Sequence, residues 1–155
     1  YFTHCFSIVG DNSNPHYAIS LRFLALCLYR KGMLVKAEET FYKALNLAQE
    51  SHHIRNEVYI QAFLAMVQLD RNDVQSAQQI LSRSLQLAYR YKIRELIPLI
   101  QRTYSRIYVL HSNIPAAHSA LTEAIDIYER IGMRRELAEA REELAKLDAL
   151  ETESA

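Results

Sequence analysis

The chain has 155 residues, of which half are hydrophobic, and its 18 basic and 18 acidic residues give a formal net charge of zero. A neutral chain offers no global attraction for nucleic acid, and no apolar run approaches the roughly 18 residues of a membrane span. The composition therefore favours a soluble domain that binds neither nucleic acid nor membrane. Helical periodicity dominates every segment between the turns, so the domain is predicted to be all helical.

Small residues recur along the chain at a spacing of 40 positions. The alanines are Ala37, Ala77 and Ala117, and each is followed four residues later by a large apolar residue and seven residues later by a small one. A repeat of this length indicates one supersecondary unit that is copied along the chain. Because small residues let two helices approach closely, each copy is predicted to be a packed pair of helices.

In chain order, the predicted helices alternate between the first and the second member of each pair. Residues 1–12 lie 40 positions before the end of the second helix of the first pair. They are therefore predicted to be the remnant of a second helix from a preceding pair. The predicted helices that follow span 15–31, 34–50, 55–71, 74–90, 95–111, 114–130 and 134–150. The last of these is an unpaired first helix, and residues 151–155 are predicted to be a disordered tail.

Particular side chains mark the limits of these helices. Asp73 and Asn113 are placed to cap two of the second helices. Pro98 must lie within the first turn of its helix, because deeper in the helix it would remove a hydrogen bond. The remaining markers are an N-terminal start at Asn14 and Pro15 and left-handed turns at Gly32 and Gly132.

The pattern resembles the tetratricopeptide repeat (TPR) family, whose unit is a helix, a tight turn and a second helix. The residues of the first copy that match the family are Leu21, Leu24, Ala25, Leu28, Ala37, Phe41 and Ala44. The second and third copies match at fewer positions. A unit of 40 residues is longer than the usual length of about 34, and it resembles the variety found in bacterial signal-transduction ATPases and maltose-regulon-type activators.

The resemblance implies an all-α fold, a right-handed superhelical solenoid of antiparallel helix pairs with about seven helices. The expected organisation is a single TPR-like domain with repeats at 15–53, 54–93 and 94–133 and a C-terminal capping helix at 134–150. Because the register begins in the middle of a unit, we expect the chain to be a fragment of a larger protein. Five acidic residues of the last helix are interpreted as its solvated capping surface, and they are Glu136, Glu139, Glu142, Glu143 and Asp148.

No arrangement of residues indicates catalysis or a bound cofactor. Cys5 and Cys27 have no metal-ligand spacing, and Cys27 lies among leucines, so we expect buried, unreactive thiols in a reducing cytoplasm. His52 and His53 are adjacent in a predicted turn and cannot converge on one metal. The sequence contains no motif typical of a phosphate-binding loop, a nucleophile elbow or a pair of catalytic carboxylates. We therefore expect no enzymatic activity, no metal and no cofactor.

The TPR resemblance implies a concave ligand groove lined by the first helices. Carried over by position, the groove residues are Arg22, Leu26, Tyr29, Tyr59, Phe63, Met66, Arg102 and Arg106. This set suits a protein or peptide with apolar anchors and acidic groups, since arginine grips carboxylates through a planar fork of donors. The alternative is that the apolar members are core packing and the arginines are solvated. The family's clamp for chaperone tails needs lysine and asparagine at the positions of Arg22 and Leu26, so that ligand is not expected.

Two functions of different classes remain open. One is a protein- or peptide-binding module within a larger cytoplasmic, bacterial regulatory protein. The other is a sensor of a small molecule or signalling peptide, attached to a transcriptional regulator or a signal-transduction ATPase. A further expectation concerns the start of the chain, where apolar residues without a partner helix predict either fraying or self-association. Those residues are Tyr1, Phe2, Phe6, Ile8 and Val9.

Overall fold

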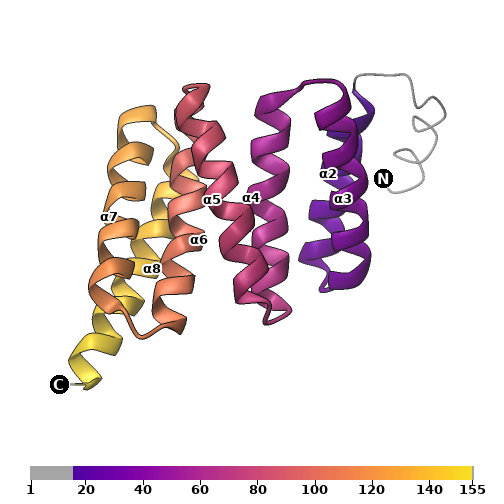
Figure 1. The fold of residues 1–155 in the computed structure, drawn as a ribbon. Coiled ribbons are helices and arrows are strands. Elements are labelled where there is room, and N and C mark those ends of the chain that lie inside the picture. The colour runs from indigo at the N-terminus through magenta and orange to yellow at the C-terminus, as the bar shows by residue number, and fades with distance from the viewer. Residues whose placement is uncertain (1–15, 155) are drawn as a thin grey trace. The chain divides into compact units, whose positions relative to one another are not determined.

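The computed structural model describes residues 16–154, and it consists there of α-helices joined by short turns (Figure 1). The elements are α2 (Tyr17–Arg30), α3 (Leu34–Glu50), α4 (Ile54–Asp70), α5 (Val74–Arg90), the 3₁₀ turn η1 (Arg94–Leu96), α6 (Ile97–Leu110), α7 (Ile114–Ile131) and α8 (Arg134–Ser154). The predicted helix limits agree closely with these bounds. The remnant predicted at 1–12 and the start predicted at Asn14 and Pro15 lie outside the described residues.

The end of α8 differs from the prediction of a disordered tail. The helix passes Leu150 and continues to Ser154. Leu150 and Glu151 are good helix formers, and no proline or glycine follows to stop the helix. The periodic apolar pattern that set the predicted limit ends earlier than the helix, because a helix can extend into solvent beyond its last packed turn.

The chain divides within α5 into two compact units, one ending at Ile80 and the other beginning at Leu81. In the first unit α2 packs on α3, α3 on α4, and α2 also on α4. In the second unit α6 packs on α7, and α7 on α8. Within each unit the helices run antiparallel to their sequence neighbours (Figure 1). This arrangement is the stacked helix pair that the 40-residue spacing predicts.

The recurring alanines lie at the packed faces of the helices. Ala37, Ala77 and Ala117 are all fully buried. In the first unit, Ala25 of α2 and Phe41 of α3 belong to the same buried apolar cluster as Ala37. In the second unit, the buried clusters join α7 to α8; their buried members are Ala117, Leu121, Ala124, Tyr128, Ala140 and Leu147. The small residues therefore have the packing role that their spacing predicts.

The helices before the turns at 32, 52, 72, 92, 112 and 132 all end in the same way. The first residue beyond α7 and the second residue beyond each of the other helices adopt a positive φ, between 52° and 75°, and two of these residues are Gly32 and Gly132. The next residue donates its backbone N–H to a carbonyl five positions earlier, as in the 2.8 Å bond from Asn113 to Tyr108. These are Schellman ends. The sequence predicts them only at the glycines, because His52, Asn72, Lys92 and Ser112 are not glycine.

Two of the predicted caps and the predicted proline position are confirmed. The Asn113 side chain accepts a 3.2 Å hydrogen bond from the backbone N–H of Ala116 at the start of α7. The Asp73 carboxylate accepts a 3.0 Å bond from the backbone N–H of Ser76 at the start of α5. Pro98 lies in the first turn of α6. The local sequence thus explains where these helices begin.

The prediction of a buried, unreactive thiol at Cys27 is wrong. Cys27 is a free thiol and is exposed. Neighbouring leucines do not imply burial on a helix, because consecutive residues point about 100° apart around its axis. The buried positions on this helix are Ala18, Leu21 and Ala25. Cys5 lies outside the described residues.

Candidate binding site

Arg22 of α2 lies against α4 in the first unit. Its guanidinium carbon is 4.2 Å from the centre of the Tyr59 ring and 4.8 Å from the centre of the Phe23 ring. Its Nη1 donates a 2.8 Å hydrogen bond to Oδ1 of Asn56. Asn56 and Tyr59 share one side of α4, since residues three apart are neighbours on a helix surface. We call Arg22, Phe23, Asn56 and Tyr59 the arginine site.

The arginine site has donors that the described residues do not satisfy. Nε of Arg22 and Nδ2 of Asn56 are buried without a hydrogen-bond partner. Leaving such a donor unpaired costs about 1–3 kcal/mol. Nη2 of Arg22 is not among these buried atoms, and the bond to Asn56 engages only Nη1, so Nη2 is the donor available to an acidic group.

Burial also acts on the charge of Arg22. It lowers the pKa of Arg22, and the interaction with Tyr59 opposes this only in part. Arginine nevertheless remains charged at neutral pH, because its ordinary pKa is so high. A half-buried cation between two aromatic rings is stabilised by their faces. A bound anion would stabilise it further by compensating the lost hydration.

The remaining predicted groove residues of the first unit adjoin the arginine site or the core. Phe63 lies 5.0 Å from Tyr59, ring centre to ring centre, and 6.3 Å from the buried Phe41. Leu26 and Phe63 are half-buried and pack against the core cluster, and Met66 is also half-buried. Leu26 and Phe63 thus serve the core, all three side chains retain some accessible apolar surface, and Phe63 lies beside Tyr59.

Tyr29 has a structural role at the far end of the same helix pair. Its ring packs against the core cluster, and its hydroxyl donates a 2.7 Å hydrogen bond to the Asp70 carboxylate. This bond joins the last turns of α2 and α4. Any ligand that used the Tyr29 hydroxyl as a donor would have to displace Asp70.

Arg102 of α6 is held by α8 within the second unit. Its Nη2 donates a 2.5 Å hydrogen bond to the Glu143 carboxylate, and its Nε donates a 3.1 Å bond to the other oxygen of that carboxylate. Glu139 lies 3.4 Å away and forms a second ion pair. Burial alone would lower the pKa of Arg102, but Glu143 and the hydrogen bond with the buried Tyr128 outweigh burial and raise it. The guanidinium donors with which Arg102 could bind a carboxylate of a ligand are thus occupied.

This arrangement corrects two expectations from the sequence. Glu139 and Glu143 of α8 are not a purely solvated surface, because they neutralise Arg102. Arg102 itself is not a solvated arginine, since only 15% of its side chain is exposed. Arg106, one turn further along α6, is exposed. Both arginines belong to the second unit, whereas the arginine site belongs to the first.

Sequence reasoning missed Asn56, which supplies the only hydrogen-bond acceptor to Arg22 among the described residues. A signal for it exists in α4, where polar residues interrupt an otherwise apolar helix and are buried; they are Asn56, Glu57, Gln61 and Gln68. Gln61 and Gln49 both bond to the Glu57 carboxylate, and Gln68 bonds to Glu38 of α3. Asn56 bonds to a cation, Arg22.

The described residues contain no cluster of three or more His, Cys, Asp or Glu side chains that could hold a metal ion. Within the same part of the chain, no helix is both long and apolar enough to cross a membrane.

Comparison with solved structures places this fold among TPR-like helical repeats. The chain is similar to BtubC (BKLC) from P. vanneervenii, with 15% identity and a TM-score of 0.63, over 90% of this chain and 66% of that one. It is also similar to a Podosopora anserina protein of the kinesin light chain kind with nearly identical TPR-like repeats, with 16% identity and a TM-score of 0.61. The latter match covers 96% of this chain and 82% of that one.

The chain thus spans slightly less than two thirds of the length of BtubC. No protein-family model and no curated protein matches the sequence. At this level of identity the likeness shows an all-α helical-repeat fold of the TPR type, as the repeat pattern predicts.

Proposed function

We propose that this domain is a protein- or peptide-binding module of a larger cytoplasmic, bacterial regulatory protein, and that its arginine site holds an acidic group of the partner. Tyr59, Phe63, Leu26 and Met66 provide apolar surface for an adjoining anchor side chain. Helical-repeat folds present rows of side chains from successive helices, which suits extended partners. A peptide with an apolar residue next to an acidic one satisfies both parts of this surface.

The observation that supports the proposal most is the state of Arg22. Its guanidinium is clamped between two rings and bonded once to Asn56, so its position is fixed before a ligand arrives. A fixed donor loses little conformational entropy on binding, which raises affinity. Arg102 is the opposite case, because a ligand would first have to displace Glu143.

The experiment selects binders from a display library of random 12-residue peptides and titrates the enriched peptides by fluorescence anisotropy. The variants are Arg22→Ala and Arg22→Lys, and Arg30→Ala is the matched control at an exposed position of the same helix. We expect Arg22→Ala to weaken binding by about 1–3 kcal/mol, the scale of a charged hydrogen bond. Arg22→Lys should retain only part of the wild-type affinity, because lysine lacks the planar set of donors of a guanidinium.

Equal affinities for wild type and Arg22→Ala would place the binding surface elsewhere. The alternative function is a sensor of a small effector. It would be favoured if the library yielded no binder while a small molecule raised the melting temperature of wild type and not of Arg22→Ala. Circular dichroism of each variant verifies that the helices remain folded.

A further inference from the structure

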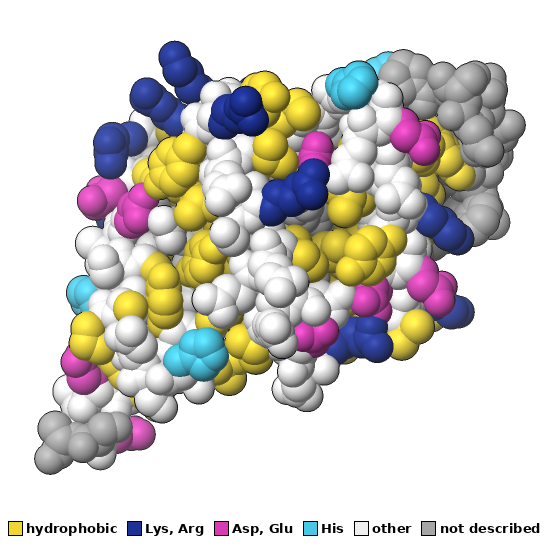
Figure 2. Space-filling view, in the orientation of Figure 1, with side chains coloured by type: hydrophobic (Ala, Val, Ile, Leu, Met, Phe, Trp, Pro, Cys, Tyr) yellow, Lys and Arg dark blue, Asp and Glu magenta, His cyan; other side chains and the backbone are white. Residues whose placement is uncertain are grey.

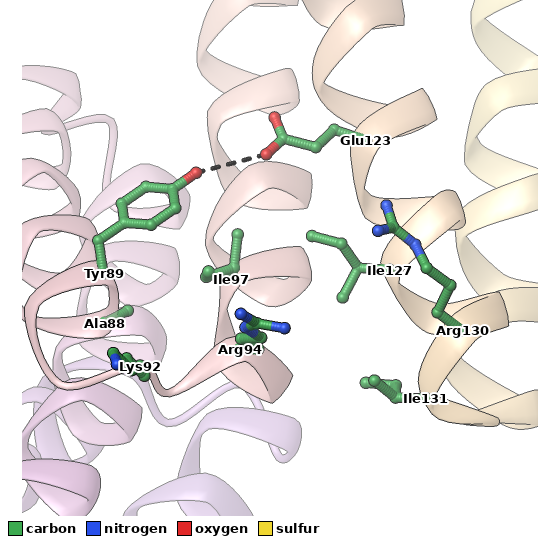
Figure 3. Close-up of a pocket in the computed structure, with 9 residues that line it drawn as sticks. All are labelled: Ala88, Tyr89, Lys92, Arg94, Ile97, Glu123, Ile127, Arg130 and Ile131. Atoms are coloured by element: carbon green, nitrogen blue, oxygen red, sulfur yellow. Dashed lines mark hydrogen bonds between the residues drawn. The ribbon is translucent and has the colours of Figure 1, made fainter.

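A hollow of about 520 Å³ lies in the second unit, where α5 and α7 end and α6 begins (Figure 3). Volumes of this size are typical of sites for small ligands and anchor side chains. Its lining comes from the last turn of α5, the turn after it, η1, the first residue of α6 and the second half of α7. The lining residues are Ala88, Tyr89, Lys92, Arg94, Ile97, Glu123, Ile127, Arg130 and Ile131.

The lining is apolar in the middle. Ile97 and Ile127 lie opposite each other across the hollow, with Ala88 and Ile131 nearby (Figure 3). Tyr89 and Ile131 at the rim are 54% and 41% exposed. Exposed apolar side chains that continue into an apolar hollow can bury a large side chain of a partner.

Three cations line the same hollow, from different elements. Lys92 follows α5, Arg94 begins η1 and Arg130 lies in the last turn of α7. None of the three forms an ion pair with a described residue. Among the described residues, the only hydrogen bond of the Arg130 guanidinium is a 3.2 Å bond from its Nε to the backbone carbonyl of Asp126. Figure 2 shows Lys and Arg side chains gathered with apolar ones over this end of the second unit.

The carboxylate that lines the hollow and the acidic residue next to Arg130 in sequence already have partners. Glu123 is the one carboxylate of the lining, and it accepts a 2.8 Å bond from Gln101 and a 3.4 Å bond from the Tyr89 hydroxyl. That pair lies at the end of the hollow away from Lys92 and Arg94 (Figure 3). Glu129 is paired with Arg141 of α8. A cation at the C-terminal end of a helix complements the helix dipole, and one charge at the end of α5 and one at the end of α7 are enough for that role. The dipoles therefore do not explain all three cations.

We propose that this hollow is a second binding site, which takes a peptide segment of a partner protein with a large apolar side chain beside acidic residues. The apolar anchor occupies the space between Ile97 and Ile127. Its acidic neighbours lie against Lys92, Arg94 and Arg130, where they complement a surplus of positive charge. The site is independent of the arginine site, since all of its residues belong to the second unit.

The test uses the same display library of random 12-residue peptides and three groups of variants. Arg94→Gln with Arg130→Gln removes two cations of the hollow, and Ile131→Glu places a negative charge at its exposed rim. The matched control is Arg90→Gln with Arg134→Gln, which removes the same charge from exposed positions outside the hollow. Arg22→Ala tests whether a peptide binds at the arginine site instead.

We expect a class of enriched peptides with Leu, Ile or Phe within three positions of Asp or Glu. These peptides should bind at least about tenfold more weakly to both hollow variants, the loss expected when charged hydrogen bonds are removed. They should bind with unchanged affinity to the control and to Arg22→Ala. Raising the salt concentration from about 0.05 to 0.5 M should weaken their binding, because the site is accessible to ions.

Three outcomes would overturn the proposal. One is that all enriched peptides bind the hollow variants as well as they bind wild type; if their binding is then lost in Arg22→Ala, the arginine site alone is supported. Another is enrichment of peptides without acidic residues. The third is that no peptide is enriched while octanoate binds wild type and not the hollow variants, which would make the hollow a site for small amphiphilic anions.

Discussion

Removing the Arg102 side chain should destabilise the second unit, although an arginine on a repeat helix would ordinarily contribute little. Arg102→Ala removes two hydrogen bonds to Glu143, at 2.5 and 3.1 Å, and the ion pair with Glu139. It also removes the hydrogen-bond partner of Tyr128, which is only 2% exposed.

The magnitude follows from the burial of these groups. A charged hydrogen bond contributes about 1.5–3 kcal/mol, and a buried hydroxyl left without a partner costs about 1–3 kcal/mol. Glu143 and Glu139 are 38% and 46% exposed, so water can replace part of what the carboxylates lose. We therefore expect Arg102→Ala to lower the free energy of unfolding by about 2–3 kcal/mol.

Urea unfolding followed by circular dichroism measures this change. The exposed Arg134→Ala is the control and should change stability by less than about 0.5 kcal/mol. A double-mutant cycle with Glu143→Ala should give a coupling energy of about 1–2 kcal/mol between the two residues. An unfolding midpoint of Arg102→Ala equal to that of wild type, or a coupling energy near zero, would refute the role assigned to this ion pair.

Four further predictions concern single residues. His52→Gly should stabilise the protein by up to about 1 kcal/mol, because glycine adopts the observed φ of 52° without strain; a lower melting temperature would contradict this. Asp73→Ala should cost stability at pH 7, because hydrogen bonds from Ser76 stabilise the charged carboxylate and lower the pKa of Asp73. The cost should shrink progressively as the pH falls below the ordinary pKa of 3.8, because the contribution of Asp73 disappears as the folded-state carboxylate is protonated. Asn113→Ala should instead cost about 1 kcal/mol over the same acidic range, and urea titrations at several pH values would measure both changes. Ala77→Leu should destabilise by about 1–3 kcal/mol through overpacking, and an unchanged urea midpoint would mean that Ala77 has room beside it. With the other cysteine replaced by serine, Cys27 should react with a thiol reagent at a rate independent of unfolding, which labelling with and without urea compares.

Much of the fold could be predicted because its determinants are local. The limits of α5 and α7 follow from Asp73 and Asn113, whose side chains bond to backbone groups only three residues away. Ala37 and Ala117 are buried as predicted because helix pairing repeats with the sequence. The turns at His52 and Ser112 were predicted, but their left-handed conformation was not, because it is imposed by the helix end and not by the residue type.

The candidate sites were predictable only in part because they depend on long-range contacts. Arg22 was identified by its position in a TPR-like helix, but Asn56, its partner, is 34 residues away and has no charge pattern that links it to Arg22. Arg102 was assigned to a groove because its pairing with Glu143, 41 residues away, has no local signature. The convergence of Lys92, Arg94 and Arg130 on an apolar hollow could not be predicted from the sequence, because it depends on the packing of α7.

The central claim is that Arg22 receives the acidic group of a bound peptide. NMR spectra of the arginine Nε–H groups, recorded during titration with an enriched peptide, test it most directly. We expect the Arg22 resonance to shift on binding, because the acidic group binds the same guanidinium, whereas the Arg102 resonance, whose Nε–H is already bonded to Glu143, should stay unchanged. A shift of the Arg102 resonance with the Arg22 resonance unmoved would contradict this claim.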